Sequence, residues 1–413
     1  MGNQNLTVSV KEANEIILNS IRSLGCENVS IMEASRRVLY EDIISDIMLP
    51  PLDDSAMDGY ALIAEDTLGA SRSNPVKLQV IDEIQAGGSH IGKEVTRGKA
   101  IRIMTGAPIP EGADAVVQFE DTDEGDGYVR IFREVDSRER NIRPAGESIK
   151  RGDIVLSRGV RLSSADVGIL ASMNRREVNV YRQPTVSIIS TGDEIVDIGE
   201  EIQIGQIRNV NAYTLYSEVK KYNGLPDYLG IAKDTLKDMK EMFLKALKAD
   251  VVISTGGVSM GRYDFVKDIY NDLGVEIQFE WINVKPGRPC TFGTKDNKLI
   301  FGLPGNPVST LTSFIQFVRP ALLRLMGAKK IMKPIVSAFL EEDIKKKPGK
   351  VHLIRGFFTI KDNEFYVSTT GNQKSSVLLS MSSANCLIII PEDIAKVHAG
   401  EKVAIQLIDH DEI

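Results

Sequence analysis

The chain has 413 residues, of which 42% are hydrophobic and 26% are charged, and its formal net charge at pH 7 is −7. This balance is typical of a folded globular protein rather than a disordered one, and the length predicts roughly two to four domains. An acidic chain is poorly suited to non-specific nucleic-acid binding, so an anionic ligand would need a local cluster of basic residues.

The cysteines and the first residues favour a cytoplasmic protein. Cys26, Cys290 and Cys386 lie far apart and match no metal-binding or redox spacing. The first 20 residues contain no basic stretch followed by an apolar one, so we expect no export signal. Apolar runs of about eighteen residues, which a membrane span requires, do not occur, and we expect no contact with a membrane.

The first part of the chain predicts one helix followed by a β-rich region. Apolar residues recur at helical spacing over residues 8–24 and indicate an amphipathic helix. Residues 49–60, LPPLDDSAMDGY, are rich in turn formers and acids and are predicted to be a loop. Residues 76–140 contain short strand-like runs separated by glycine turns, which predicts a small barrel or sandwich. A short helix is then expected, with Ser163 or Ser164 as its N-cap.

Strand and helix patterns alternate after Pro184. TVSIIS (185–190) and ADVVIS (249–254) are apolar strands, and each is followed by a Thr-Gly turn. Amphipathic helices are predicted over residues 211–222 and 235–248. This alternation indicates a doubly wound parallel α/β sheet, whose ligands bind beyond the carboxyl ends of the strands.

The last part of the chain adds one strand, one helix and a second β-rich region. KLIFGLPGNP is a strand with a stiff turn, and the helix over residues 308–326 should be kinked near Pro320. After Gly327 the pattern is strand-like, which predicts a small all-β C-terminal domain. The chain contains no GxxxxGK[ST], GxGxxG or GxSxG motif, so a P-loop ATPase, a dinucleotide-binding unit and a serine hydrolase are disfavoured.

Two glycine-containing loops follow the apolar strands. In STGDE, Thr191 and Gly192 expose backbone N–H groups that suit phosphate or carboxylate oxygens, although a tight turn capped by Asp193 is equally consistent. STGGVSMGRYD is more specific, because a structural turn rarely needs three glycines, a serine and an acid together. Its candidate ligand-binding residues are Gly256, Gly257, Ser259 and Asp264.

Three acidic residues are predicted at one edge of the sheet. Glu194, Asp234 and Asp264 would each follow a strand of the parallel sheet, although Asp234 equally suits the N-cap of the next helix. Carboxylates that converge in this way repel one another unless a cation compensates them. Oxygen ligands without nearby His or Cys point to Mg²⁺ at these three positions, and the four scattered histidines are interpreted as ordinary.

Basic and rigid loops supply the complementary charge. NVKPGRP places Lys285 and Arg288 around a Pro-Gly turn, which suits an anion, although a solvated turn is equally consistent. GLPGNP, with Pro304, Asn306 and Pro307, is a stiff loop at a helix N-terminus and is a second place for an anion. LDDSAMDGYAL contains an acid, Asp58, with no evident packing role, and RIMTGAPIP contains Thr105 in a similar turn.

Taken together, these segments resemble the MoeA family of molybdopterin molybdenumtransferases, which includes the E domain of gephyrin and its plant counterpart. The resemblance runs in the family's order from about residue 10 to residue 408 and is very specific. Its segments are PPLDDSAMDGYA, RIMTGAPIPEGADAVV, NIRPAGE, ISTGDE, GIAKD, STGGVSMGRYD, NVKPGRP, FGLPGNPVS and TTGNQKSS.

The resemblance implies an elongated, homodimeric, multidomain subunit of α/β plus β class. Its central doubly wound α/β molybdopterin-binding domain would span residues 183–328, and a C-terminal β-barrel would span residues 329–413. A discontinuous N-terminal dimerisation domain is expected over residues 1–50 and 141–182, with a β-rich inserted domain over residues 51–140. The implied activity is insertion of molybdate into adenylylated molybdopterin, with Mg²⁺-dependent release of AMP.

The resemblance also assigns site residues by motif position. The implied catalytic residues are Asp58, Thr105, Glu194, Asp234, Asp264, Lys285 and Arg288. Together with the loop residues above, the implied substrate-binding residues are Arg143, Thr191, Gly192, Gly256, Gly257, Ser259, Pro289, Pro304, Asn306, Pro307, Arg355 and Ser375. The chain departs from the usual pattern at Ser148, Arg262 and Arg288, where relatives often carry an acid, an acid and a lysine.

Two other functions are open from the sequence. The Thr-Gly turns are also similar to those of molybdopterin adenylyltransferases, and the E domain of gephyrin is also a non-catalytic scaffold. Retained acids and the KPGRP loop favour the molybdenum transferase over both. The partners expected from the resemblance are a molybdopterin adenylyltransferase and acceptor molybdoenzymes, with no nucleic acid.

Overall fold

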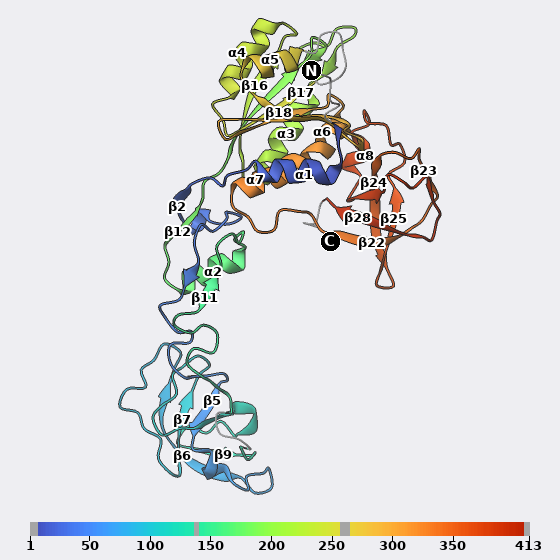
Figure 1. The fold of residues 1–413 in the computed structure, drawn as a ribbon. Helices are drawn as coiled ribbons and strands as arrows, with labels where there is room; N and C mark the ends of the chain where they lie inside the picture. The colour runs from blue at the N-terminus through green and yellow to red at the C-terminus, as the bar shows by residue number, and fades with distance from the viewer. Residues whose placement is uncertain (1–6, 136–139, 257–264, 409–413) are drawn as a thin grey trace. The chain divides into compact units, whose positions relative to one another are not determined.

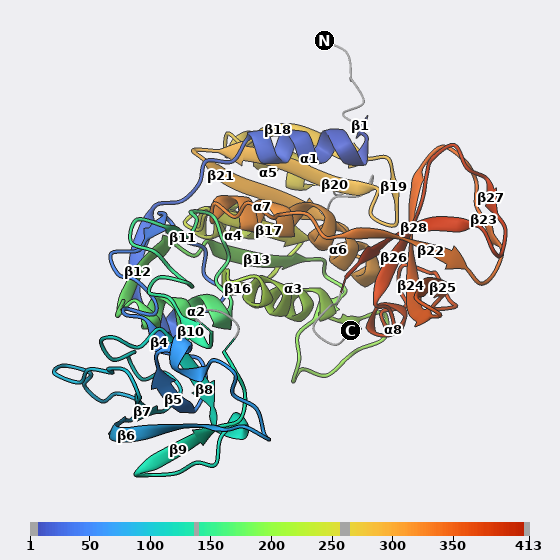
Figure 2. The same ribbon diagram turned by 90° about the horizontal axis from the view of Figure 1, so that it is seen from below.

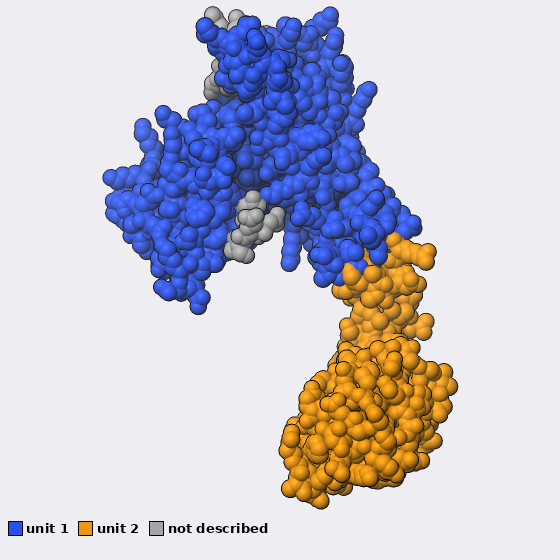
Figure 3. All heavy atoms as spheres, turned by 180° about the vertical axis from the view of Figure 1, so that it is seen from behind, with its two compact units in different colours: residues 1–40, 159–167, 177–413 blue, residues 41–158, 168–176 orange. Residues whose placement is uncertain are grey.

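The computed structural model describes residues 7–135, 140–256 and 265–408, which form two compact units (Figure 3). Unit 1 comprises residues up to Tyr40, Gly159–Val167 and everything from Glu177 onward. Unit 2 comprises Glu41–Arg158 and Gly168–Arg176. The finer division into four domains stays a prediction. No helix in the described ranges is long and apolar enough to cross a bilayer.

Unit 1 is built on a seven-stranded sheet in which four neighbouring strands at one side are parallel, as predicted (Figures 1 and 2). The parallel strands lie in the order β21 (Lys298–Leu303), β17 (Val251–Thr255), β13 (Thr185–Thr191) and β16 (Leu225–Ala232). The middle residues of β13, β17 and β21 are mostly apolar and buried because helices cover both faces. The two apolar strands predicted at residues 185–190 and 249–254 are neighbours in this sheet, and Val186 pairs with Val251.

The sheet is mixed rather than wholly parallel. Strand β20 (Pro289–Lys295) runs antiparallel to β21 and to β18 (Glu276–Ile282), and the short β1 (Thr7–Val8) pairs with β18 at the edge. A two-residue turn at Asp296 and Asn297, both with positive φ, joins β20 to β21 as a hairpin. The alternation pattern that indicated a parallel sheet therefore describes only the four strands from β21 to the edge strand β16.

Helices cover both faces of the sheet, as a doubly wound fold requires. Along β17, Val251 and Ile253 face one apolar core and Val252 faces the other. One core contains helices α1 (Val10–Asn19), α3 (Val210–Lys221), α6 (Pro307–Ser313) and α7 (Arg319–Leu325), and the other contains α4 (Leu236–Ala246) and α5 (Phe265–Asp272).

Two helices differ in detail from their predicted extent. The predicted helix over residues 8–24 is shorter, because Ser9 and Glu12 form a capping box at its start and it ends at Asn19. The kink expected near Pro320 takes the form of a π-helical turn over Phe314–Val318, directly before α7. Proline lacks the backbone N–H that a regular helix would use there.

The C-terminal part of unit 1 is a closed barrel. Strand β24 (Val351–Lys361) pairs with both β25 (Glu364–Thr369) and β26 (Cys386–Ile390). The ring is completed by β22 and β28, and β19 of the α/β part joins the outside of β24. Their bounds are β19 (Val284–Lys285), β22 (Ile335–Leu340) and β28 (Lys402–Leu407), with α8 (Leu379–Ser382), β23 (Ile344–Lys345) and β27 (Lys396–Val397) between strands.

Short elements complete unit 1. Strands β2 (Cys26–Ser30) and β12 (Glu177–Tyr181) form an antiparallel pair, and β14 (Ile195–Val196) pairs with β15 (Ile207–Arg208) beyond the end of β13. Helix α6 lies beside the barrel in both views (Figures 1 and 2). The α/β part and the barrel thus meet where β19 and α6 lie.

Unit 2 contains the predicted all-β region as a five-stranded sheet in the order β8-β5-β7-β6-β9. The predicted loop over residues 49–60 is wrong at its end, because Gly59 and Tyr60 begin β5 and Tyr60 is fully buried. The strands are β5 (Gly59–Leu62), β6 (Val76–Ile84), β7 (Lys99–Ile103), β8 (Ala115–Gln118) and β9 (Tyr128–Ile131). Two short antiparallel strand pairs also form, namely β3 (Ile43–Ile44) with β11 (Ile154–Leu156) and β4 (Asp54–Ser55) with β10 (Ile142–Arg143). Helix α2 spans Ser164–Ser172.

Candidate active site

The two Thr-Gly turns lie side by side at the carboxyl edge of the parallel strands. Thr191 ends β13 and Thr255 ends the neighbouring β17, and the Thr191 Oγ1 donates to the Thr255 carbonyl at 3.2 Å. Gly256 has a φ of +89°, and a Cβ there would lie 2.5 Å from the Thr191 carbonyl oxygen. Only glycine allows this approach, so the turn at Gly256 depends on its residue type.

Acidic side chains gather beside the first turn. The Glu194 carboxylate folds back over Gly192, where a Cβ would lie 2.7 Å from Glu194 Oε2. Asp234 directly follows β16, and its backbone N–H donates to Asp193 Oδ1 at 3.2 Å. Burial and the nearby charges of Asp193 and Glu194 raise the pKa of Asp234. The three carboxyl groups therefore share one electrostatic environment.

The N-cap alternative for Asp234 is wrong. Helix α4 is capped by Thr235, whose side chain accepts from the Asp238 N–H at 3.2 Å. Asp234 has no capping bond to α4, so its position beside Asp193 and Glu194 requires another explanation. A carboxylate near two others is stabilised by a cation.

Part of the predicted acidic site lies outside the described residues. Asp264, Gly257 and Ser259 belong to residues 257–264, as does Arg262, one of the departures from the family pattern. In the described ranges, no three His, Cys, Asp or Glu side chains are arranged to hold a metal ion. Glu194 and Asp234 supply the oxygen ligands that Mg²⁺ prefers, so the described residues fit that ion as part of a ligand set.

A polar cavity of about 380 Å³ lies beyond this edge, and it is lined by Thr191, Glu194, Asn209, Asn211, Thr255 and Gly256 among others. Asn209 caps α3 and accepts from the Ser190 hydroxyl at 2.9 Å, while its amide donates to the Tyr228 hydroxyl at 2.7 Å. The Asn211 amide donates to the Gly305 carbonyl at 2.8 Å and so fixes the GLPGNP loop against α3. We call this space the edge cavity.

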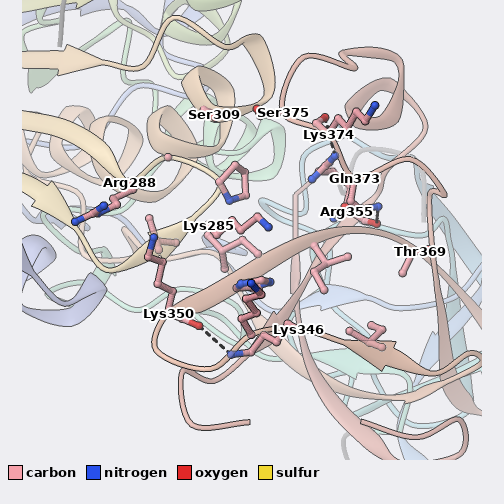
Figure 4. Close-up of a pocket in the computed structure, with 18 of the residues that line it drawn as sticks. Lys285, Arg288, Ser309, Lys346, Lys350, Arg355, Thr369, Gln373, Lys374 and Ser375 are labelled. Carbon is pink, nitrogen blue, oxygen red and sulfur yellow. Dashed lines mark hydrogen bonds between the residues drawn. The ribbon is translucent and has the colours of Figure 1, made fainter. Parts of the chain in front are cut away.

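A second, larger cavity of about 1530 Å³ lies between the α/β part and the barrel, and we call it the basic cavity (Figure 4). Lys285 and Arg288 line it from the α/β side, and Arg355 and Lys374 line it from the barrel side (Figure 4). The Arg288 guanidinium lies 5.2 Å from the centre of the Trp281 ring, which restricts its position. Pro289, Pro304 and Asn306 line both cavities, so the two adjoin.

Arg355 is the most unusual residue of the basic cavity. It is only 1% exposed, in β24, and burial lowers its pKa. Its Nε donates to the Ser380 hydroxyl at 3.1 Å, and its Nη2 donates to the Asn372 and Lys374 carbonyls at 3.3 and 3.2 Å. Within the described residues it contacts no carboxylate, and its Nη1 has no hydrogen-bond partner. A buried cation without a counter-charge is unfavourable, so this guanidinium is suited to an anionic ligand.

The Arg355 side chain is held by a loop that the motif TTGNQKSS supplies. The Gln373 side chain accepts from the Arg355 N–H at 3.0 Å and donates to the Arg355 carbonyl at 3.1 Å. The Ser380 hydroxyl also donates to the Val377 carbonyl at 2.7 Å, so its position is fixed. Ser375 lies on the same loop, where its carbonyl accepts from the Val308 N–H at the start of α6.

The remaining predicted polar residues, Asp58, Thr105 and Arg143, belong to unit 2. Asp58 Oδ1 accepts from both the backbone N–H and the hydroxyl of Thr105, at 2.7 and 2.8 Å, and these bonds lower the pKa of Asp58. Arg143 Nε donates to Asp54 Oδ1 at 2.7 Å, and its side chain lies 4.0 Å from where a Gly106 Cβ would be. Two motifs that are 47 residues apart thus form one polar cluster.

Sequence reasoning missed several residues of these cavities. Ser309, Lys346, Lys350 and His352 line the basic cavity, and Asn209 and Asn211 line the edge cavity. The lysines had a visible signal, because KKKPGK surrounds a Pro-Gly turn as NVKPGRP does. The asparagines had none, since they read as ordinary residues at the start of a helix.

Comparison with known proteins places the whole described chain in one family. Residues 8–174 match the MoeA N-terminal region (domain I and II), residues 187–324 match a probable molybdopterin binding domain, and residues 337–408 match the MoeA C-terminal region (domain IV). Similar proteins named molybdopterin molybdenumtransferase occur in Staphylococcus epidermidis, at 37% identity over 97% of this chain and 95% of the relative, and in Haemophilus influenzae, at 38% identity over 93% and 94%.

Solved structures agree with this assignment. The structure of a molybdopterin biosynthesis moeA protein from Pyrococcus horikoshii OT3 matches with a TM-score of 0.83 and 34% identity. The match covers 97% of this chain and 100% of that one. The predicted architecture, with a central α/β domain, a β-rich region and a C-terminal barrel, is therefore confirmed.

Proposed function

Because the chain belongs to the MoeA family of molybdopterin molybdenumtransferases, we propose that it inserts molybdate into adenylylated molybdopterin and that the basic cavity holds the molybdate. Family membership makes the chain a transferase of molybdenum cofactor biosynthesis that acts by molybdenum insertion. The anion site, the nucleotide product and the metal go beyond membership, and the geometry of the two adjoining cavities supports them.

The unpaired Arg355 guanidinium carries the assignment of the anion site. Molybdate is a tetrahedral dianion, and the free Nη1 of Arg355 can donate to one of its oxygens. Lys285 supplies a further cation across the cavity, Arg288 adds charge at its margin with its side chain turned away from Arg355 (Figure 4), and Ser375 lines the same cavity. An anion bound there gains charge-assisted hydrogen bonds and relieves the burial of Arg355.

The edge cavity suits the second substrate. Backbone groups of the Thr191-Gly192 and Thr255-Gly256 turns approach it, as a phosphate or a pterin amide requires. By motif position, Gly257 and Ser259 would extend this surface, and the stiff loop of Pro304, Asn306 and Pro307 with Pro289 would keep the two substrates in adjoining places.

The acidic side chains are assigned to the phosphate anhydride of adenylylated molybdopterin. Glu194 and Asp234, with Asp264 by motif position, would hold Mg²⁺, which when bound neutralises charge on the bridging phosphates as AMP leaves. We assign Asp58, Thr105 and Arg143 of unit 2 a functional role by motif position: the Arg143 guanidinium and the Thr105 hydroxyl suit an anionic group, and the Asp58–Thr105 bonds fix the Thr105 hydroxyl.

The proposal includes the assembly and the place of action. We expect a cytoplasmic homodimer that receives its substrate from a molybdopterin adenylyltransferase and passes its product to acceptor molybdoenzymes. Sedimentation of the full chain at micromolar concentration tests the homodimer, and a single monomeric species would contradict it.

The central experiment measures AMP. The full chain is incubated with adenylylated molybdopterin and Mg²⁺, with and without molybdate, and AMP is quantified by chromatography. We expect molybdate to stimulate AMP release and chelation of Mg²⁺ to suppress it. AMP release that is the same with and without molybdate would contradict the proposal.

Two alternatives make different predictions in the same assay. An adenylyltransferase would consume ATP and unadenylated molybdopterin and release pyrophosphate. A non-catalytic scaffold would release neither product. The retained acids of the edge cavity and the unpaired Arg355 favour the molybdenum transferase over both.

A further inference from the structure

The end of β23 and the segment between β23 and β24 place four lysines at the basic cavity. Lys345, Lys346, Lys347 and Lys350 all line it, within the sequence KKKPGK. The segment is anchored to its neighbour by backbone bonds, from Lys346 N–H to the Ala395 carbonyl and from Gly349 N–H to the Glu392 carbonyl, both at 2.8 Å. The backbone that carries these lysines is therefore held in place by hydrogen bonds. We call Lys345–Lys350 the lysine hairpin.

Only one of these ammonium groups is used to hold the hairpin together. The Lys346 Nζ donates to the Lys350 and Glu392 carbonyls at 3.0 and 3.2 Å, as Figure 4 shows for the first bond. Across the described part of the chain, Lys345, Lys347 and Lys350 have no ion pair. Like charges this close repel one another, so the hairpin gains from an anion in the cavity.

The acids of the same cavity are already bound elsewhere. The Glu342 carboxylate accepts from the Thr369 N–H at 2.7 Å, and the Asp343 carboxylate binds Lys396 at 2.9 Å. The cavity lining holds these two carboxylates against eight lysines and arginines, in a chain whose net charge is −7. The positive field at this cavity is therefore local and opposite in sign to the whole chain.

His352 lies inside this field. Burial and the charges of Lys285, Lys346 and Lys350 lower the pKa of His352 to about 4, so its imidazole is neutral at pH 7. The interpretation of this histidine as ordinary stays a prediction. His352 gives a direct measure of the field, because removing a nearby lysine charge should raise its pKa.

We propose that Lys345, Lys347 and Lys350 of the lysine hairpin make the mouth of the basic cavity a charge filter that captures dianionic tetrahedral oxyanions in preference to monoanions of the same shape. The proposal rests on the proposed function, since Arg355 is the site to which the captured anion passes. Arg355 distinguishes these anions through a single charge, since their shapes and hydrogen-bond acceptors are alike, and the three lysines add further charge at the same cavity. A cluster of unpaired cations separates the anions more strongly, because its attraction grows with the charge of the ligand.

The test compares tungstate, a dianion, with perrhenate, a monoanion, by isothermal titration of the full chain at low ionic strength. The variant Lys347→Gln/Lys350→Gln removes two charges from the hairpin. Its matched control, Lys237→Gln/Lys245→Gln, removes two exposed charges from α4, away from both cavities. The His352 pKa, followed by NMR, should rise in the hairpin variant and not in the control, because Lys350 is one of the charges that lower it.

We expect the hairpin variant to bind tungstate about three- to tenfold more weakly and perrhenate only about two- to threefold more weakly, because the lost Coulomb energy is proportional to the charge of the ligand. The control should match the wild type, and about 0.5 M salt should shrink the difference because it screens exposed charges. An unchanged ratio of tungstate to perrhenate affinity would overturn the charge filter. If the wild-type chain binds neither anion, the proposed anion site itself is wrong. If Arg355→Met loses tungstate binding while the hairpin variant keeps the wild-type ratio of tungstate to perrhenate affinity, the anion site stands and only the role of the lysine hairpin is wrong.

Discussion

Arg182 and Arg355 show two opposite uses of a guanidinium in the same unit. At the amino-terminal edge of the sheet, Arg182 makes two bonds of 2.8 Å to Asp250, which also accepts from the N–H and the hydroxyl of Thr185 at 2.8 Å each. Arg355 is more deeply buried but has no carboxylate partner within the described residues. The charge of Arg182 is neutralised by a carboxylate of the protein itself, whereas the charge of Arg355 is neutralised only when an anionic ligand binds.

The difference indicates that the Arg182–Asp250 pair contributes to stability and that Arg355 contributes to function. A satisfied ion pair lowers the free energy of the folded state, while an unsatisfied buried charge raises it and is retained where it binds a ligand. The Asp250 pair lies where strands begin, and Arg355 lies beside the carboxyl edge, where ligands of α/β sheets bind. Variants of the two regions should therefore have opposite effects on activity and on the free energy of unfolding.

The largest effect is expected from Arg355→Met. Removing the donor that faces the molybdate should lower kcat/KM for molybdate-dependent AMP release by about 100- to 1000-fold. The free energy of unfolding should change by less than about 1 kcal/mol, because the variant also removes an unpaired buried charge. Chemical denaturation and the AMP assay measure both. A large loss of stability with normal activity would show that Arg355 stabilises the fold and does not bind the anion, which would contradict the account.

The matched change at the other region is Asp250→Asn. It should lower the free energy of unfolding by about 1 to 2 kcal/mol, since the Arg182 side chain is 41% exposed and solvent weakens the pair. Asp250 lies outside both cavities, so kcat and KM should stay at wild-type values. Activity loss at a temperature where the variant is fully folded would contradict this assignment.

The same pair predicts a pH dependence. Its hydrogen bonds hold the pKa of Asp250 at about 2, below its ordinary value of 3.8. Because the folded-state pKa is depressed, the contribution is fully present above about pH 4 and is lost as the pH falls towards 2. Wild type should therefore converge on Asp250→Asn in stability over this range, as followed by denaturation at several pH values. A stability difference that is constant down to pH 2 would contradict this account.

A smaller effect is expected at the acidic side of the edge cavity. Asp234→Asn removes repulsion with Asp193 and Glu194, so without Mg²⁺ the variant should be at least as stable as the wild type at pH 7. Saturating Mg²⁺ should stabilise the wild type by about 1 kcal/mol and the variant by less. Thermal melts with and without the ion measure this. Equal Mg²⁺ stabilisation of both proteins would remove Asp234 from the proposed ligand set.

The smallest effect is expected from Ser380→Ala, which removes the hydroxyl that positions Arg355 Nε. We expect KM for molybdate to rise about three- to tenfold, with kcat nearly unchanged, because the guanidinium charge remains but is held less firmly. Ser383→Ala, on an exposed hydroxyl that bonds only to the Leu379 carbonyl of its own turn, is the control. A fall in kcat alone would argue against a positioning role.

The fold could be predicted further than the site. Local patterns located β13 and β17 and their Thr-Gly turns, because a buried strand followed by glycine is encoded within a few residues. The antiparallel course of β20 was not predicted, since no strand was assigned between the NVKPGRP loop and the KLIFGLPGNP strand. The strand β5 was hidden by the acids that precede Gly59.

The site depends on contacts that no local pattern encodes. Arg355 and Ser375 were reached only through the family resemblance, because an arginine within a strand carries no sign that it lacks a carboxylate partner. Ser380, 25 residues further along, was not identified at all. The alternative role of Asp234 as an N-cap was excluded only when Thr235 was seen to cap α4.

The most direct test is the position of tungsten in crystals of the full chain soaked with tungstate, located by anomalous scattering. The account predicts one strong site in the basic cavity, with an oxygen of the anion accepting from Arg355 Nη1 and with Lys285 and Arg288 nearby. A basic cavity without tungsten, in crystals where the anion binds elsewhere or where Arg355 pairs with a carboxylate, would contradict it.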